Sequence, residues 1–160
     1  MELRFKDRNI VEIDNARIIF RNFEGRGDKY NREGDRNFAV VIPNREIAEE
    51  LINDVNNYGV GWNVKIREPR EEGDDEFIYL PVKVKFNNRG PAVYLETNGV
   101  RNQLGEEAIG LLDNVDISSV SMDIRPYDDE INGKPFRAAY LQSLLVVQDV
   151  DRFAPRREEE

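Results

Sequence analysis

In four segments of the sequence that have the two-residue periodicity of β-strands, basic or aromatic side chains alternate with apolar ones. Alternate residues of a strand point to the same side, so each set would share an outward face while the apolar residues face a core. Basic groups neutralise phosphates and aromatic rings stack on bases, which are the two contacts that a single-stranded nucleic acid offers. The outward residues of the four segments are Arg17, Arg21, Phe23, Lys65, Arg67, Tyr79, Lys83, Lys85 and Tyr94.

A polar loop, residues 24–35, separates the first two strand segments and carries more groups of the same kind. It contains Lys29, Tyr30 and Arg32, between basic residues at Arg26 and Arg36. Its length and glycine content are typical of functional loops. We expect a flexible arm that can close over a bound strand.

The charge balance limits this interpretation. The chain has 160 residues with 23 Lys and Arg against 32 Asp and Glu, a net charge of −9, and a polyanionic partner is unusual for an acidic protein. The acidic excess lies in residues 43–59, 102–135 and 149–160, whereas residues 1–42 and 60–101, which contain the predicted strands with outward basic residues, are nearly neutral. Outward Lys and Arg are also ordinary on a solvated sheet, so the interpretation depends on the four sets sharing one surface.

Catalytic chemistry has little support in the residue types. The chain has no Cys and no His, which excludes disulfides, thiolate metal sites and Ser-His-Asp triads. Two acidic runs, residues 74–76 and 128–130, could surround a divalent ion as in a nuclease, but adjacent carboxylates in a loop do not converge on one point. We expect solvated loops there, and we predict no catalytic residues, no metal and no cofactor.

The elements that position these residues are mainly strands. A helix is expected after Pro43, capped by Asn44, with apolar positions continuing to Tyr58 and ending at Gly59. A weaker helix is expected around residues 106–112. Pro81 lacks an N–H and predicts an edge strand or a bulge. The strands are expected at residues 16–23, 36–42, 62–67, 77–86, 92–97, 115–125 and 136–147, with Phe20, Phe38, Trp62 and Phe86 in the core.

This order predicts a mainly β protein with minor α content. Short antiparallel strands with one inserted helix suit a small barrel of the oligonucleotide/oligosaccharide-binding (OB) type, and a β-sandwich is the alternative. One domain is expected over residues 1–148, followed by a disordered acidic tail at 149–160. No apolar run is long enough to span a membrane and the first residues do not form a signal peptide, so a soluble cytoplasmic protein without a membrane partner is expected.

Several runs of the sequence resemble a family of small tailed-bacteriophage proteins that bind single-stranded DNA. The resemblance covers about residues 13–148 and rests on residues 16–23, 29–31, 36–40, 61–65, 82–86 and 124–127. It implies an OB-like barrel, single-stranded DNA as the partner, little sequence preference, and a role in phage replication or recombination. It also implies that an acidic tail recruits other phage proteins, although this tail lacks the apolar last residue of bacterial single-strand-binding tails.

Two other functions remain open at this point. The same strands could make protein contacts in a phage structural or scaffold-type module that binds no nucleic acid. A metal-dependent nuclease is the third hypothesis, and the separated acidic runs are its only support. The sequence predicts neither the oligomeric state nor the length of strand that is bound.

Overall fold

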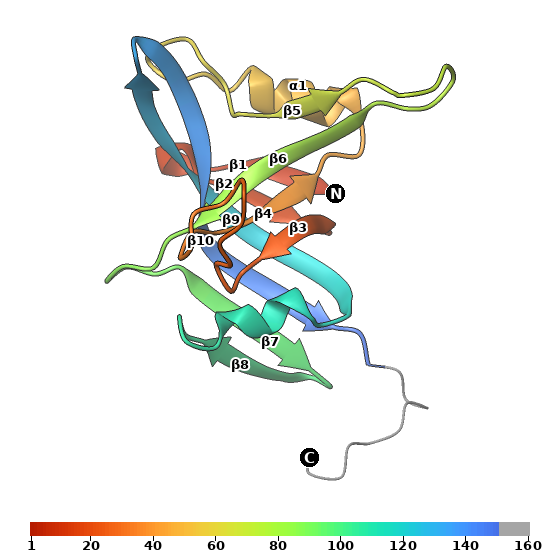
Figure 1. Cartoon of the computed structure of the whole chain (residues 1–160), viewed down its shortest axis with the longest axis vertical. Coiled ribbons are helices and arrows are strands. Elements are labelled where there is room, and N and C mark those ends of the chain that lie inside the picture. The colour runs from red at the N-terminus through yellow and green to blue at the C-terminus, as the bar shows by residue number, and fades with distance from the viewer. Residues whose placement is uncertain (151–160) are drawn as a thin grey trace.

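Ten strands are joined by hydrogen bonds into one sheet in the computed structural model, which describes residues 1–150. One α-helix and two short 3₁₀ segments lie between the strands (Figure 1). The elements are β1 (Glu2–Phe5), η1 (Asp7–Asn9), β2 (Val11–Asp14), β3 (Ile18–Asn22), β4 (Arg36–Val41), α1 (Arg45–Ile52), β5 (Lys65–Arg67), β6 (Phe77–Val84), β7 (Ala92–Thr97), β8 (Val100–Leu104), η2 (Ile109–Asp113), β9 (Ile117–Ile131) and β10 (Lys134–Gln148).

The strand order is β1-β2-β9-β10-β6-β4-β3, with β5 beside β6 and the β7–β8 hairpin beside β10. Most pairs are antiparallel, but β10 runs parallel to both β6 and β7, a mixture that the expected antiparallel sheet did not include. The mainly β fold with one inserted helix is confirmed. Within residues 1–150 no ladder joins β1 to β3, so the OB-like barrel is open rather than closed.

Strand β6 shows how the hydrophobic pattern positions the site. Ile78, Leu80, Val82 and Val84 are buried in the core, while Phe77, Tyr79, Pro81 and Lys83 alternate on the other face. Each fully buried aliphatic side chain contributes about 1.5–3 kcal/mol, so the register of this strand is strongly specified. Pro81 lies between the part of β6 that pairs with β5 and the part that pairs with β10. The strand is internal rather than an edge strand, and Pro81 falls at the break between these two ladders, where only β4 pairs with it.

A bulge in β3 corrects two predictions. Ile18 pairs with Val40 and Ile19 with Ala39, but the next pair joins Asn22 to Asn37, so β3 holds one residue more than β4. An extra residue exchanges the inward and outward faces beyond it. Phe20, expected in the core, has a φ of 54° and is 56% exposed. Phe23, expected to face outward, is fully buried and stacks on Phe38 with ring centroids 5.1 Å apart.

Helix α1 begins as predicted and ends early. The Asn44 side chain accepts a hydrogen bond from the Ile47 N–H at 2.9 Å and caps the first turn. The helix stops at Ile52 because the chain turns back, and the Trp62 N–H donates to the Leu51 carbonyl at 3.2 Å. A Cβ on Gly61 would lie 1.9 Å from the Ile52 carbonyl oxygen, so only glycine permits this approach.

The long β9–β10 hairpin extends beyond its predicted ends. Asn132 and Gly133 form its two-residue turn with φ values of 53° and 78°, which is the conformation that favours Asn-Gly. Strands β1 and β2 were not predicted, and β2 pairs with β9. No helix among residues 1–150 is long and apolar enough to span a bilayer. The acidic tail predicted at 149–160 lies outside the described residues from position 151 onward.

Candidate nucleic-acid interface

Three aromatic rings meet on the outer face of the sheet. Phe20 from β3 lies edge-to-face against Tyr79 of β6, with centroids 5.6 Å apart, and against Phe77 at 6.3 Å. The rings of Phe77 and Tyr79 lie 5.4 Å apart. Phe20 and Phe77 are exposed and Tyr79 is half-buried. Such rings form a platform on which bases can stack, because each leaves part of its surface open to solvent.

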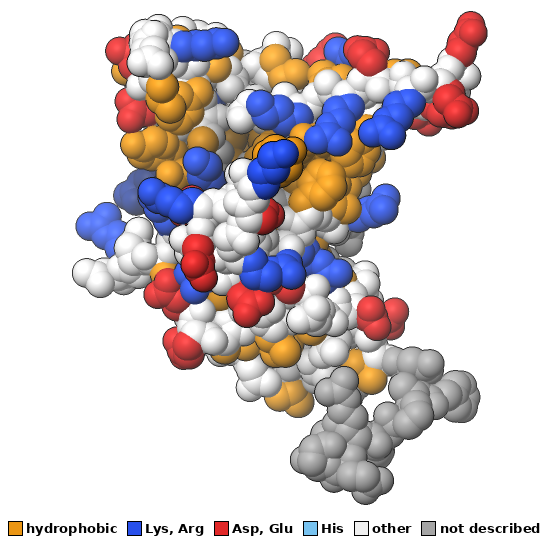
Figure 2. Space-filling model, viewed as in Figure 1, with side chains coloured by type: hydrophobic (Ala, Val, Ile, Leu, Met, Phe, Trp, Pro, Cys, Tyr) orange, Lys and Arg blue, Asp and Glu red, His pale blue; other side chains and the backbone are white. Residues whose placement is uncertain are grey.

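Strand β5 places two cations beside this aromatic platform of Phe20, Phe77 and Tyr79. Lys65 pairs in register with Tyr79, and Arg67 pairs with Phe77, so both side chains share the outer face. The Arg67 guanidinium lies 5.3 Å from the centre of the Tyr79 ring and donates to its hydroxyl at 3.2 Å. Figure 2 shows hydrophobic side chains over β3 and β6 with Lys and Arg side chains around them.

The 24–35 loop forms the opposite wall of a groove. Side-chain hydrogen bonds link its residues to one another and to β4. The Asn31 amide donates to the carbonyls of Arg26 and Asp35 at 2.8 and 3.0 Å, and its oxygen accepts from Asn37 at 3.0 Å. The groove has a volume of about 760 Å³, and its lining includes Phe20, Arg21, Arg26, Asp28, Tyr30, Arg67 and Tyr79.

A second hollow continues the groove along β6. It has a volume of about 350 Å³ and includes Lys83, Lys85, Arg32 and Tyr140 in its lining. Asn31 and Asn37 line both hollows, so the two are adjacent. The outer face of β6 therefore carries a continuous series from the aromatic rings at one end to two lysines at the other.

The electrostatics of this groove favour an anion. Among residues 1–150, no carboxylate lies within ion-pair distance of Lys65, Arg67, Lys83 or Lys85. Asp28 lines the groove, but one of its carboxylate oxygens already accepts the N–H groups of Tyr30 and Asn31, both at 2.7 Å. The basic groups are thus free to bind phosphates despite the net charge of −9.

Not every residue predicted for the site lies at the groove. Arg21 lines it, but its Nη1 donates to the carbonyls of Leu112 and Val115 at 2.9 and 2.8 Å and so holds η2 in place. Arg17 is exposed just before β3, and Lys29 lies exposed on the loop, 5.7 Å from the Tyr30 ring. Tyr94 lines a separate small hollow with Asp14 and Asp123, away from the basic groups. The sequence missed Phe20 and Phe77, and no periodic signal marks the bulge that exposes Phe20.

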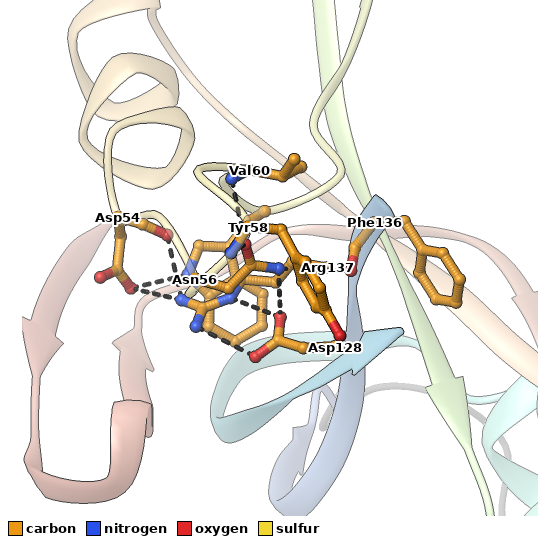
Figure 3. Close-up of polar contacts among 8 residues, drawn as sticks. Asp54, Asn56, Tyr58, Val60, Asp128, Phe136 and Arg137 are labelled. Atoms are coloured by element: carbon orange, nitrogen blue, oxygen red, sulfur yellow. Dashed lines mark hydrogen bonds and ion pairs between the residues drawn. The ribbon is translucent and has the colours of Figure 1, made fainter. Parts of the chain in front are cut away.

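An ion cluster around the buried Arg137 anchors the segment that leads into β5 (Figure 3). Arg137 of β10 is 2% exposed, donates to both carboxylate oxygens of Asp128 at 2.9 and 3.2 Å, and lies 5.3 Å from the Trp62 ring centre. It also donates to the Asp54 carbonyl at 3.0 Å, and the Asn63 N–H bonds the Arg137 carbonyl at 3.1 Å.

The same cluster sets the charge state of Asp128. Burial raises the pKa of the Asp128 carboxyl, but hydrogen bonds from Arg137 and Asn56 and the Arg137 charge outweigh burial, so the pKa falls below its usual value. Asp128, the first residue of the acidic run at 128–130, therefore stabilises the fold. The middle carboxylate of the run, Asp129, accepts a hydrogen bond from the Tyr127 hydroxyl at 3.1 Å.

Comparisons with solved structures concern the fold. The chain is similar to the single-stranded DNA-binding protein from bacteriophage Enc34, with a TM-score of 0.56 and 17% identity over 98% of this chain and 96% of that chain. The structure of that protein in complex with ssDNA gives a TM-score of 0.54 and 17% identity over 95% of this chain and 93% of that chain. The C-terminally truncated form of the same protein gives a TM-score of 0.55 and 16% identity over 96% of this chain and 92% of that chain. At these identities the likeness shows a shared fold.

The sequence comparisons establish the family. No curated protein sequence matches the chain. A family model described as "Putative phage ssDNA-binding domain" matches residues 2–157, which is nearly the whole chain. The protein therefore belongs to this family of phage ssDNA-binding domains.

Proposed function

We propose that the protein binds single-stranded DNA in the groove between β6 and the 24–35 loop, with little sequence preference. The observation that carries the proposal is the mutual contact of three solvent-facing rings, Phe20, Phe77 and Tyr79, with Arg67 against the last of them. Soluble proteins rarely leave adjacent aromatic rings open to water unless a partner covers them. Every base has a π-face, so stacking on such a platform does not read sequence.

The basic residues divide into two groups by their place along the groove. Lys65 and Arg67 lie beside the aromatic platform, where the phosphates of stacked nucleotides would pass. Lys83 and Lys85 lie further along β6 and would hold the phosphates of the strand as it leaves the platform. Tyr30 lines the groove and adds a further ring. The exposed basic groups that add a weaker and salt-sensitive attraction are Arg17, Lys29 and Arg32.

A titration of labelled oligo-dT with two single variants tests the proposal. Phe20→Ala removes an exposed ring of the platform and is expected to weaken binding by about 1–3 kcal/mol, or roughly 5- to 150-fold. Tyr94→Ala is the matched control, because this ring lies beside Asp14 and Asp123 away from the groove. Equal affinities for Phe20→Ala and the unmodified protein would overturn the proposed site. Absence of oligo-dT binding by the unmodified protein would favour the protein-interaction module instead.

We also propose that binding, rather than catalysis, is the task of this chain in the replication or recombination of a phage genome in the host cytoplasm. The family to which it belongs supports the phage context. The acidic residues 149–160, with a closing run of three Glu, would recruit other phage proteins. Deleting residues 151–160 is then expected to lower phage yield while the purified protein still binds oligo-dT. An unchanged phage yield would remove the recruiting role.

A further inference from the structure

Three arginines converge on a hollow beyond the lysine end of the groove. Arg8, Arg89 and Arg125 line a space of about 450 Å³ together with uncharged residues from the 87–91 turn and β10. No Asp or Glu lines this hollow, and none of the three arginines has an ion-pair partner among residues 1–150. Seven of the eleven other arginines within residues 1–150 are paired with carboxylates, such as Arg4, Arg36, Arg45 and Arg137.

Different elements bring these arginines together. Arg8 belongs to η1, which lies against β9. Arg89 lies in a turn that two hydrogen bonds close. The backbone N–H of Arg89 donates to the side-chain oxygen of Asn87 at 2.8 Å, and the backbone N–H of Asn87 donates to the Gly90 carbonyl at 2.8 Å. Arg125 is half-buried on β9. A cluster of like charges costs free energy in the unliganded protein, so an anion that neutralises them would bind favourably.

The strand pairing connects this hollow to the groove. Lys83 of β6 pairs in register with Tyr140 of β10, and Tyr140 pairs with Arg125 of β9. Register partners on neighbouring strands share a face, so the three side chains form one row across the sheet. With strands about 4.8 Å apart, the row spans about 10 Å from Lys83 to Arg125. Tyr140 itself lines the lysine end of the groove.

A second group of rings occupies this row. Tyr140 stacks on Tyr127 with centroids 5.2 Å apart and planes at 17°, and Phe136 lies 6.2 Å from Tyr127. The Arg125 guanidinium lies 5.2 Å from the centre of the Tyr140 ring. Figure 2 shows a second hydrophobic area over the β9–β10 hairpin, on the same side of the molecule as the one over β3 and β6. The arrangement repeats that of Tyr79 and Arg67.

We propose that the bound DNA strand continues from Lys83 across Tyr140 to a second phosphate-binding site formed by Arg8, Arg89 and Arg125. The proposal rests on the proposed function of the groove. The ligand of the hollow is a phosphodiester of the same strand, held by guanidinium groups that suit phosphate oxygens. A strand too short to span both sites would bind the groove alone.

Oligo-dT of increasing length, from about 4 to about 16 nucleotides, separates the two sites, since this is the range that one OB fold covers. The test variant is the full chain with Arg8→Ala and Arg89→Ala. The control is Arg101→Glu, which changes the net charge equally and lies on β8 at the far end of the molecule (Figure 1). We expect the test variant to match the control on the shortest oligonucleotide and to bind the longest roughly tenfold more weakly.

The salt dependence gives a second readout. For the longest oligonucleotide, the log–log slope of affinity against salt should fall by about 1.4 in the Arg8→Ala/Arg89→Ala variant, or about 0.7 for each lost phosphate contact. Tyr127→Ala should weaken binding of the longest oligonucleotide without changing that slope, because stacking releases no counterions.

The outcomes distinguish this proposal from the proposed function. If the arginine variant behaves as Arg101→Glu at every length, the strand does not reach the hollow and the extension is overturned. An equal loss at all lengths also overturns it, because the arginines would then act on the groove itself. Phe20→Ala reports on the groove and is expected to weaken binding at every length. If Phe20→Ala has no effect while the arginine variant loses binding, the proposed groove fails and the arginine site remains.

Discussion

The rings of Phe20 and Tyr79 meet edge-to-face at 5.6 Å although β4 separates their strands. Phe20 reaches across because the bulge in β3 turns it out of the core. Ala39 of β4 pairs with Ile19 on one side and Pro81 on the other, and its small side chain leaves space for the rings to meet. One extra residue in the edge strand β3 thus lets rings from β3 and β6, which share no hydrogen bonds, form one aromatic platform.

The bulge predicts opposite roles for two phenylalanines three residues apart. Phe23→Ala should lower the free energy of unfolding by about 3–5 kcal/mol, since it leaves a cavity against Phe38. Phe20→Ala should change it by less than about 1 kcal/mol, because more than half of this ring is already in water. Urea unfolding followed by tryptophan fluorescence measures both. A larger loss for Phe20→Ala than for Phe23→Ala would show that β3 has no bulge here.

The sequence predicted the elements whose periodicity is uninterrupted and failed where a single residue shifts the register. Alternation in β6 correctly placed Tyr79 and Lys83 on the outer face, and Lys85, just after the strand, is also exposed. The same rule applied to β3 exchanged Phe20 and Phe23, because a bulge leaves no mark in the pattern of residue types. Tyr94 also fits the alternation. Only the strand pairing shows that β7 lies beside residues 143–147 of β10, further along that strand than the residues that pair with β6, and that Tyr94 lines a hollow without basic residues.

Asn44 and the Asn-Gly turns were predictable because their conformations depend on neighbouring residues. The cap at Asn44 forms as expected, and the Asn-Gly pairs at residues 98–99 and 132–133 form two-residue turns with the positive φ values that this dipeptide favours. The early end of α1 was not predictable, since it depends on the return of the chain to Leu51. The cluster around Arg137 likewise joins residues far apart in the sequence, and no local pattern marks it.

The two lysines at the end of β6 should contribute to binding and not to stability. Lys83→Ala combined with Lys85→Ala is expected to lower the salt slope of oligo-dT binding by about 1.4, since each lysine neutralises one phosphate. The melting temperature should stay nearly constant, because neither side chain has an ion-pair partner within residues 1–150 and both are exposed. Arg101→Glu again controls for net charge. An unchanged slope would place the strand outside this end of the groove.

The conformation of the 24–35 loop, which faces β6, should depend on the side chain of Asn31. Asn31→Asp replaces an amide that donates to the Arg26 and Asp35 carbonyls by a carboxylate that they repel. We expect faster tryptic cleavage after Arg26, Lys29 and Arg32 and weaker oligo-dT binding, with little change in the melting temperature. Asn102→Ala, at an exposed asparagine on β8, is the control. Cleavage at the control rate would show that Asn31 does not hold the loop.

The lowered pKa of Asp128 makes the ion cluster sensitive to acid. Burial opposes ionisation of this carboxyl, but the bonds from Arg137 and Asn56 prevail and keep its pKa below the ordinary 3.8. The unfolded state therefore binds the proton more readily than the folded state. The stabilisation is fully present above about pH 4 and is lost as the pH falls through the lower, folded-state pKa.

Asp128→Asn isolates this contribution because the amide cannot ionise. At pH 7 the variant should lose about 1.5–3 kcal/mol of unfolding free energy, the usual value of a hydrogen bond to a charged group. The difference in unfolding free energy between the unmodified protein and the variant should then shrink as the pH is lowered below about 4. Taking this difference cancels the contributions of the carboxylates that both proteins contain. Asp129→Asn, on the exposed neighbouring residue, should show no comparable loss at pH 7. Urea unfolding at a series of pH values gives both curves, and a difference that stays constant down to pH 2 would contradict the ionised pairing of Asp128 with Arg137.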